Sequence, residues 1–86
     1  MKKKNNPAKP TILLIDWVDS VNNSGWKPTD ECKADLMICQ TAGFLVEETK
    51  DAVCLALNRT TRTGYYPFGE LISIPKVAIK TRRILR

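Results

Sequence analysis

The apolar residues of this chain come in short runs of branched side chains, separated by polar residues, glycine and proline. Runs of this kind are typical of β-strands rather than of helices. They fall in Thr11–Trp17, in three groups within Leu36–Leu57, in Glu70–Pro75 and in Arg82–Leu85. A chain of 86 residues that forms five or six short strands has room for one small core. The spacing therefore predicts a single β-rich domain.

Gly43 interrupts the apolar pattern between Leu36 and Thr49. A glycine inside a strand pattern marks a bulge or a sharp bend. We therefore expect either one strongly bent strand over this range or two strands joined at the bend. Lys50 and Asp51 are then expected to form the hairpin that leads into the next apolar run.

Two further connections have composition that indicates their structure. Pro28–Ala34 predicts a short helix, with Thr29 as its cap and acidic residues in its first turn. Lys76–Lys80 is expected to be a short turn or 3₁₀ segment that returns Ile79 to the core.

Together these elements predict a mainly β fold. The expected architecture is a small, strongly bent antiparallel barrel with one short helix after the first strand. Closure suits a short chain because it removes exposed strand edges. An α+β sandwich with the helix on one face is the alternative. Residues 1–10, polar and rich in lysine, are expected to form a disordered basic arm, and residues 11–86 the barrel domain.

One ordered set of motifs extends over most of residues 11–85. Its members are Trp17, Asp19, Gly25-Trp26, Gly43–Glu48, Leu55–Leu57, Ile72, Ile74-Pro75, Ile79 and Ile84. This order resembles that of small uncharacterised proteins encoded by bacteriophages and prophages. The resemblance implies a compact β-barrel and a phage origin, and it carries little information on chemistry because the motifs are structural.

Parts of the sequence are also similar to SH3-like and Sm-like barrels. The residues that fit the two Sm motifs are Gly43, Leu45, Ile74 and Ile79. However, Pro75-Lys76 stands where that family has Arg-Gly, no Asp-Asn pair has the spacing of its base pocket, and the helix follows the first strand instead of preceding it. The resemblance thus implies the barrel but not a uridine pocket.

Charge is segregated along the chain, which carries a net +5. Residues 1–10 contribute +4, residues 11–51 contribute −5 and residues 52–86 contribute +6. Basic segments attract phosphate and other anions. Acidic and basic faces on one small domain can also pair head to tail, so we expect a homo-oligomer.

The composition argues against catalysis. The chain has no histidine, and its three cysteines have no C-x-x-C spacing, so neither a histidine base nor a zinc site is indicated. No glycine-rich phosphate-binding motif is present. We therefore expect no enzyme activity, no catalytic residue, no metal and no cofactor. Three unpaired thiols favour a reducing compartment, and the apolar runs are too short to span a bilayer, so the expected location is the cytoplasm, that of the host for a phage protein.

Asn58–Gly69 is the strongest candidate for a binding site, because this expected loop combines arginine, threonine and adjacent tyrosines. Guanidinium groups bind phosphate, hydroxyls add hydrogen bonds, and aromatic rings stack on bases. Strand alternation is expected to place Lys80 and Arg82 together on one face of the last strand. The predicted ligand-binding residues are Arg59, Thr60, Thr61, Arg62, Tyr65, Tyr66, Lys80, Arg82 and Trp26.

These features lead to two hypotheses for function. The first is a non-catalytic, phage-type binding protein whose self-associated barrel holds a phosphate-bearing ligand. That ligand is either nucleic acid or a small nucleotide signal, sequestered as a counter-defence sponge. The second is an adaptor or inhibitor that presents an edge strand or the aromatic loop to a host protein. The sequence identifies neither the ligand nor the partner.

Overall fold

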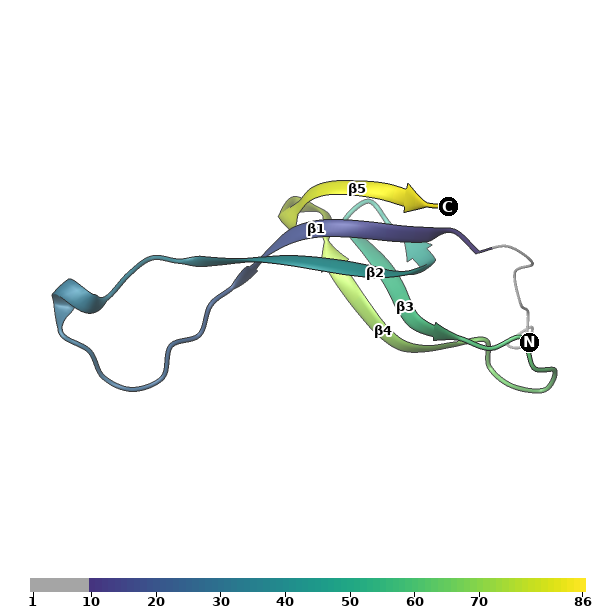
Figure 1. Cartoon of the computed structure of the whole chain (residues 1–86), viewed down its shortest axis with the longest axis horizontal. Helices are drawn as coiled ribbons and strands as arrows, with labels where there is room; N and C mark the ends of the chain where they lie inside the picture. The colour runs from purple at the N-terminus through teal and green to yellow at the C-terminus, as the bar shows by residue number, and fades with distance from the viewer. Residues whose placement is uncertain (1–9) are drawn as a thin grey trace.

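The structure, a computed structural model, describes residues 10–86, so all of the predicted basic arm except Pro10 lies outside the described residues. It contains five strands and two three-residue 3₁₀ turns (Figure 1). These are β1 (Ile12–Ser20), η1 (Thr29–Glu31), β2 (Leu36–Glu48), β3 (Ala52–Arg59), β4 (Phe68–Pro75), η2 (Lys76–Ala78) and β5 (Ile79–Leu85). The strands form one antiparallel sheet in the order β4-β3-β2-β1-β5. The predicted mainly β fold is confirmed.

β2 is a single long strand that joins the two halves of the sheet. Up to Phe44 it pairs with β1, and from Phe44 onward it pairs with β3. Gly43 is buried at this crossing, where a Cβ atom would lie 2.8 Å from the carbonyl oxygen of Ala56. Of the two alternatives for this region, one continuous bent strand is the one observed. The register shift with β3 falls between Leu45 and Glu47, not at the glycine itself.

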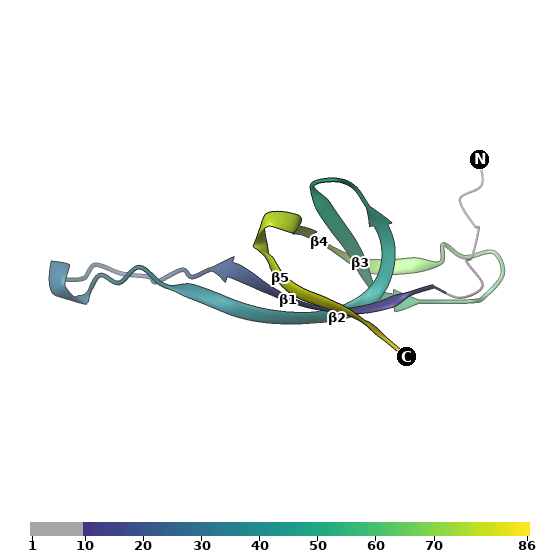
Figure 2. The same ribbon diagram turned by 90° about the horizontal axis from the view of Figure 1, so that it is seen from above.

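The core lies on the inner face of the folded sheet. Figure 2 shows β3 and β4 turned over the sheet formed by β1, β2 and β5. The buried side chains on this face alternate along the strands, as expected for a sheet with one apolar face. The cluster consists of Leu13, Ile15, Val53, Leu55 and Ile74, with Trp17, Leu45, Ile72 and Ile79 packed around it. The turn η2 leads into Ile79 at the edge of this core, as predicted.

The backbone pairing does not close the sheet. β4 pairs with β3 and β5 pairs with β1, so β4 and β5 form the two edges of the sheet within residues 10–86. The two edges are joined in sequence by η2 alone.

The predicted short helix over Pro28–Ala34 is not confirmed. This segment contains only the 3₁₀ turn η1, which is preceded by Pro28 with no capping side chain, so Thr29 is not a cap. Every residue of the segment is exposed. A short helix draws most of its stability from packing an apolar face on the rest of the protein, and this segment has no surface to pack against. The alternative sandwich, which needs a covering helix, is therefore not observed either.

β1 and β2 continue past the core as a paired ribbon. Val18 still pairs with Ile38, and Ser20 pairs with Leu36, before the chain opens into a loop that contains η1. We call residues 18–38 the hairpin projection. It gives the molecule principal extents of 57 × 25 × 23 Å and is its most prominent feature in Figure 1.

Candidate functional site

The loop between β3 and β4 contains most of the predicted ligand-binding residues. Both strands extend further than the sequence indicates, so the loop is reduced to residues 60–67. The Thr60 amide donates a hydrogen bond to the Pro67 carbonyl at 2.9 Å, which closes the base of the loop. The Arg62 amide donates to the Thr60 hydroxyl at 3.1 Å and shapes the turn that follows.

Two side chains of the loop are ordered against each other. The Arg62 guanidinium lies over the Tyr65 ring, with its central carbon 4.8 Å from the ring centroid. A cation placed in this way is attracted by the ring electrons. Tyr65 and Tyr66 are both more than half exposed, so their rings stay accessible to a ligand.

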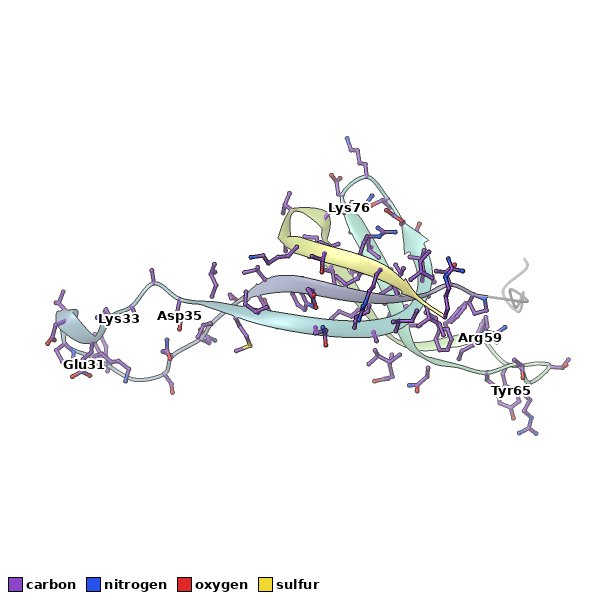
Figure 3. The ribbon with its side chains drawn as sticks, turned by 45° about the horizontal axis from the view of Figure 1, so that its top comes forward. Glu31, Lys33, Asp35, Arg59, Tyr65 and Lys76 are labelled. Atoms are coloured by element: carbon purple, nitrogen blue, oxygen red, sulfur yellow. The ribbon has the colours of Figure 1, made fainter. Side chains whose placement is uncertain are left out.

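A shallow hollow of about 250 Å³ lies at the base of this loop. Phe68 in its wall contacts Phe44 of β2, with ring centroids 6.4 Å apart, and this contact fixes the first residue of β4 against the sheet. Arg59 is half-buried at the end of β3, and Figure 3 shows it at the same end of the molecule as Tyr65. The residues that line the loop hollow are Asn58, Arg59, Thr60, Tyr66, Pro67, Phe68 and Gly69.

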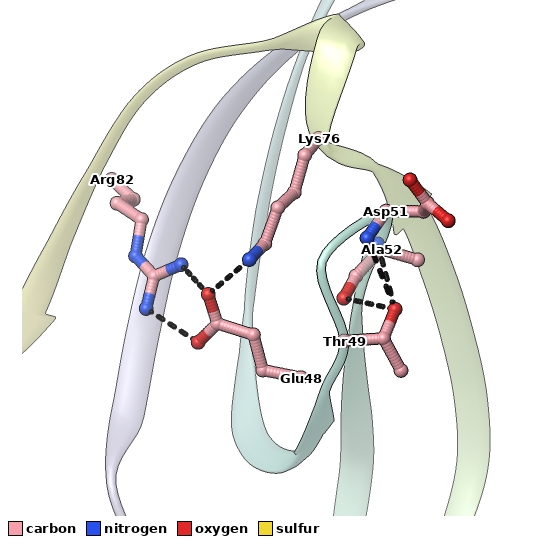
Figure 4. A network of polar contacts seen from close by, with 6 residues as sticks. All are labelled: Glu48, Thr49, Asp51, Ala52, Lys76 and Arg82. Carbon is pink, nitrogen blue, oxygen red and sulfur yellow. Dashed lines mark hydrogen bonds and ion pairs between the residues drawn. The ribbon is translucent and has the colours of Figure 1, made fainter.

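Arg82 lies away from this loop and binds a carboxylate within the molecule. Its guanidinium donates two hydrogen bonds to Glu48, at 3.0 and 3.1 Å (Figure 4). The ammonium of Lys76 contacts the same carboxylate at 2.8 Å. These donors, Arg82 first, lower the pKa of Glu48 to about 2, and Glu48 in turn raises the pKa of Arg82. The cluster links β5 and η2 to the end of β2.

Lys80 does not follow the simple strand alternation used to place it beside Arg82. Asp16 pairs with Thr81 and Trp17 pairs with Ile79, so Lys80 is the extra residue at a register shift. A bulged residue breaks the two-residue repeat of a strand. Strand alternation therefore gives no reason for Lys80 and Arg82 to share one face.

Asp16 forms a polar cluster that the sequence analysis missed. It accepts hydrogen bonds from the Gln40 amide and the Thr81 hydroxyl, each at 2.8 Å. Both bonds lower its pKa, Gln40 more strongly, and nearby Arg83 adds to the effect. The three bonded residues belong to β1, β2 and β5, so the cluster fixes the register of three neighbouring strands. The sequence alone gives no sign of this cluster, because Asp16, Gln40 and Thr81 meet only through the pairing register of the three strands.

A second hollow, of about 580 Å³, lies at the C-terminal end of β5. It has apolar side chains at its base and guanidinium groups around it, of which that of Arg82 is bonded to Glu48. We call it the C-terminal hollow. Its lining residues are Thr11, Leu13, Leu45, Arg82, Arg83, Ile84 and Arg86. The sequence analysis named only Arg82 among them.

Trp26 is the predicted site residue farthest from the others along the fold. It belongs to the loop of the hairpin projection and is fully exposed, at 102%. The segment around it, which includes Glu31 and Asp35, extends to the far end of the molecule from Arg59 and Tyr65 (Figure 3). The structure thus brings Arg59, Thr60, Thr61, Arg62, Tyr65 and Tyr66 together at one end of β3 and β4. Trp26 lies on the hairpin projection, and Lys80 and Arg82 lie on β5, outside this loop.

Within residues 10–86, no three side chains of the histidine, cysteine, aspartate and glutamate types are grouped to hold a metal ion. The described part of the chain also has no helix that is long and apolar enough to cross a membrane. Comparisons of the chain with protein family models, curated proteins and solved structures find no match. Its function must therefore be argued from its own side chains.

Proposed function

We propose that this protein is a non-catalytic binding protein that holds a phosphate-bearing ligand at the β3–β4 loop. The observation that carries the proposal is the stacking of Arg62 on Tyr65, beside a hollow lined by Arg59, Thr60 and Tyr66. Arginine and threonine supply donors for phosphate oxygens, and exposed tyrosine rings supply faces for bases. Residues 52–86 carry a net +6, which attracts an anionic ligand to this half of the molecule.

The size of the loop hollow favours a single-stranded nucleic acid over an enclosed small nucleotide. Pockets that enclose a small ligand usually measure about 300–1,000 Å³. The loop hollow, at about 250 Å³, is open and below that range, so it suits one phosphate or one base of a longer strand. A nucleic-acid strand that continues across the surface can also contact other basic residues of the segment 52–86. A free nucleotide in so small a hollow would leave much of its own surface in water.

The proposal includes the finer expectations from the sequence. The two edge strands, β4 and β5, are connected directly by the short turn η2. This connection supports a barrel-like arrangement around the small core. We propose that such barrels self-associate and act in the cytoplasm, in a phage-type setting, without catalysis.

Fluorescence anisotropy with a labelled single-stranded oligonucleotide tests the ligand. We expect Arg62→Ala and Tyr66→Ala each to weaken binding at least about fivefold, because a stacked base contributes about 1–3 kcal/mol. Lys50→Ala, at the opposite end of β3, removes the same charge and should leave the affinity unchanged. Binding should weaken steeply between about 50 and 200 mM salt.

Two other results would change this assignment. A small nucleotide that binds more tightly than the oligonucleotide, with little salt dependence, would assign the loop to nucleotide sequestration. If neither ligand binds at low salt, the proposed function is wrong.

A second candidate, a protein-interaction adaptor, is favoured by the edge of β4. This strand pairs with β3 alone, so its other edge offers backbone groups to an extended peptide. The exposed Leu71 on β4 adds an apolar contact. A pull-down that recovers one stoichiometric protein, unchanged by nuclease treatment, would favour this function over the first.

A further inference from the structure

The hairpin projection exposes apolar side chains that nothing within residues 10–86 covers. Trp26, Leu36 and Ile38 are 102%, 66% and 65% exposed, and Met37 between the last two is half exposed. A two-stranded hairpin alone is only marginally stable in water. Contiguous exposed apolar residues on a small protein mark an interaction surface. Leu36, Met37 and Ile38 form such a contiguous run, so the projection is the first surface to consider for an interaction.

The charge of the projection indicates what that molecule presents. Residues 18–38 contain four acids and two lysines, a net charge of −2. Asp30 and Glu31 both lie in the 3₁₀ turn of the loop at the tip, four and five residues after Trp26 in the sequence. The tip thus presents an exposed aromatic ring together with carboxylates, which suits an apolar depression with a cationic rim.

The C-terminal hollow of the same protein has these properties. Leu45 and Ile84 provide apolar surface, and Arg83 and Arg86 provide positive charge. Thr11, just before β1, is also part of its lining. An acidic tip and a basic hollow on one molecule are complementary.

The tip and the hollow cannot meet within one copy. The projection extends from one side of the core, while β5 runs in the opposite direction to its C-terminal end (Figure 1). The long axis of the molecule measures 57 Å. Contact between the two surfaces therefore requires a second copy of the chain.

We propose that the hairpin projection of one copy docks in the C-terminal hollow of a second copy. Trp26 packs on Leu45 and Ile84, and the carboxylates of Asp30 and Glu31 face Arg83 and Arg86. Because two different surfaces meet, the contact is head to tail, and it repeats until a ring closes or a filament grows. This inference rests on the self-association in the proposed function and is independent of its ligand.

Two double variants test the interface. The projection variant carries Trp26→Ala and Glu31→Lys, and the hollow variant carries Arg83→Glu and Arg86→Glu. Native mass spectrometry and light scattering at near-physiological salt should show assemblies of the unmodified protein. Each variant alone should be monomeric, with a dissociation constant raised at least tenfold. Circular dichroism and cooperative thermal unfolding should show that both variants fold.

An equimolar mixture of the two variants provides the decisive measurement. Each variant keeps one intact surface, so the mixture should form dimers and nothing larger. A symmetric contact, such as pairing between two β4 edges, would instead leave at least one variant assembled by itself. That result would overturn the inference. So would an unmodified protein that stays monomeric at high concentration, or a mixture of folded variants that does not dimerise.

The oligonucleotide assay separates this inference from the ligand proposal. Both variants retain the β3–β4 loop, and the projection variant also keeps every cation of residues 52–86, so it should bind the oligonucleotide as a monomer with the affinity of the unmodified protein. The hollow variant should bind more weakly, because two of its arginines become glutamates. Dimers in the mixture, with no oligonucleotide binding by the projection variant, would refute the ligand and support the interface. Binding without dimers would do the reverse.

Discussion

At Gly43, the absence of a side chain determines how closely two strands can approach. A Cβ atom at this position would lie 2.8 Å from a backbone oxygen of Ala56 and 3.1 Å from the Cβ of Leu55. Neither atom can move without opening the β2–β3 ladder or the core, because both belong to buried residues of β3. The sequence predicted the importance of this glycine correctly, but the close approach could be seen only once β3 was placed beside it.

Gly43→Ala should therefore destabilise the fold. We expect a loss of about 1–3 kcal/mol in the free energy of unfolding, the usual range for overpacking a core. Gly69→Ala is the matched control, because a Cβ there meets nothing within 4 Å and its effect should stay within about 0.5 kcal/mol. Urea denaturation followed by circular dichroism measures both. Equal effects of the two substitutions would contradict this account of Gly43.

Glu48 should make stability depend on pH on the acid side. Its pKa is lowered from 4.5 to about 2 by Arg82 and Lys76. The stabilisation is therefore complete above the unfolded pKa and is lost as the pH falls through the folded value. Near pH 3 the chain should take up about one more proton on unfolding than Glu48→Gln does. The urea midpoint of that variant should accordingly vary less between pH 2 and 5 than the midpoint of the unmodified protein.

Glu47→Gln is the control for this measurement. Glu47 precedes Glu48 on β2 and points to the opposite face of the strand, so this substitution should retain the pH dependence of the unmodified protein. If the slopes of the two variants are the same, the Glu48 cluster does not contribute to acid stability. The sequence could not predict the cluster, because Glu48 and Arg82 lie 34 residues apart and meet only when β5 joins the sheet.

At the scale of elements, the sequence located all five strands but missed strand ends that are held by backbone pairing rather than by burial. The prediction ended the first strand at Trp17, where the apolar pattern stops, whereas β1 continues to Ser20. Its last residues are held by backbone bonds to β2 rather than by burial. The terminal strand likewise begins at Ile79, and its bulge at Lys80 leaves no mark in the hydrophobic pattern. Hydrophobic periodicity detects apolar side chains: it locates the start of β2 at Leu36, but it cannot detect Asp19 and Ser20, which only pair with β2.

The core should therefore fold without the hairpin projection. Replacement of residues 19–37 by Asn-Gly, a pair suited to two-residue hairpins, would join Val18 directly to its partner Ile38. All the core residues remain in this variant, so we expect cooperative thermal unfolding with a midpoint within a few degrees of the unmodified protein. Calorimetry measures the transition. Loss of cooperative unfolding would show that the projection belongs to the folding unit.

The whole molecule departs from the shape expected of a single small domain. A compact chain of this length has a radius of gyration of about 12 Å, whereas the Cα atoms here give 17.1 Å. The segregated charge of the sequence suggested head-to-tail pairing, and that hypothesis remains a prediction. It could not locate the acidic surface, because the charges of residues 18–38 acquire a direction only when the ribbon leaves the core. Charge and shape together lead from a general expectation of self-association to the proposed contact between the hairpin projection and the C-terminal hollow.

Small-angle X-ray scattering can measure this shape directly. The hollow variant, Arg83→Glu with Arg86→Glu, is suited to the experiment because it should be monomeric and keeps the projection. Its radius of gyration should lie near 17.1 Å. When this variant also carries the replacement of residues 19–37 by Asn-Gly, its radius of gyration should fall to about 11 Å, a drop much larger than the lost mass alone would give. Similar radii for the two proteins would mean that the projection folds back on the core in solution, where its apolar residues would be covered without a second copy.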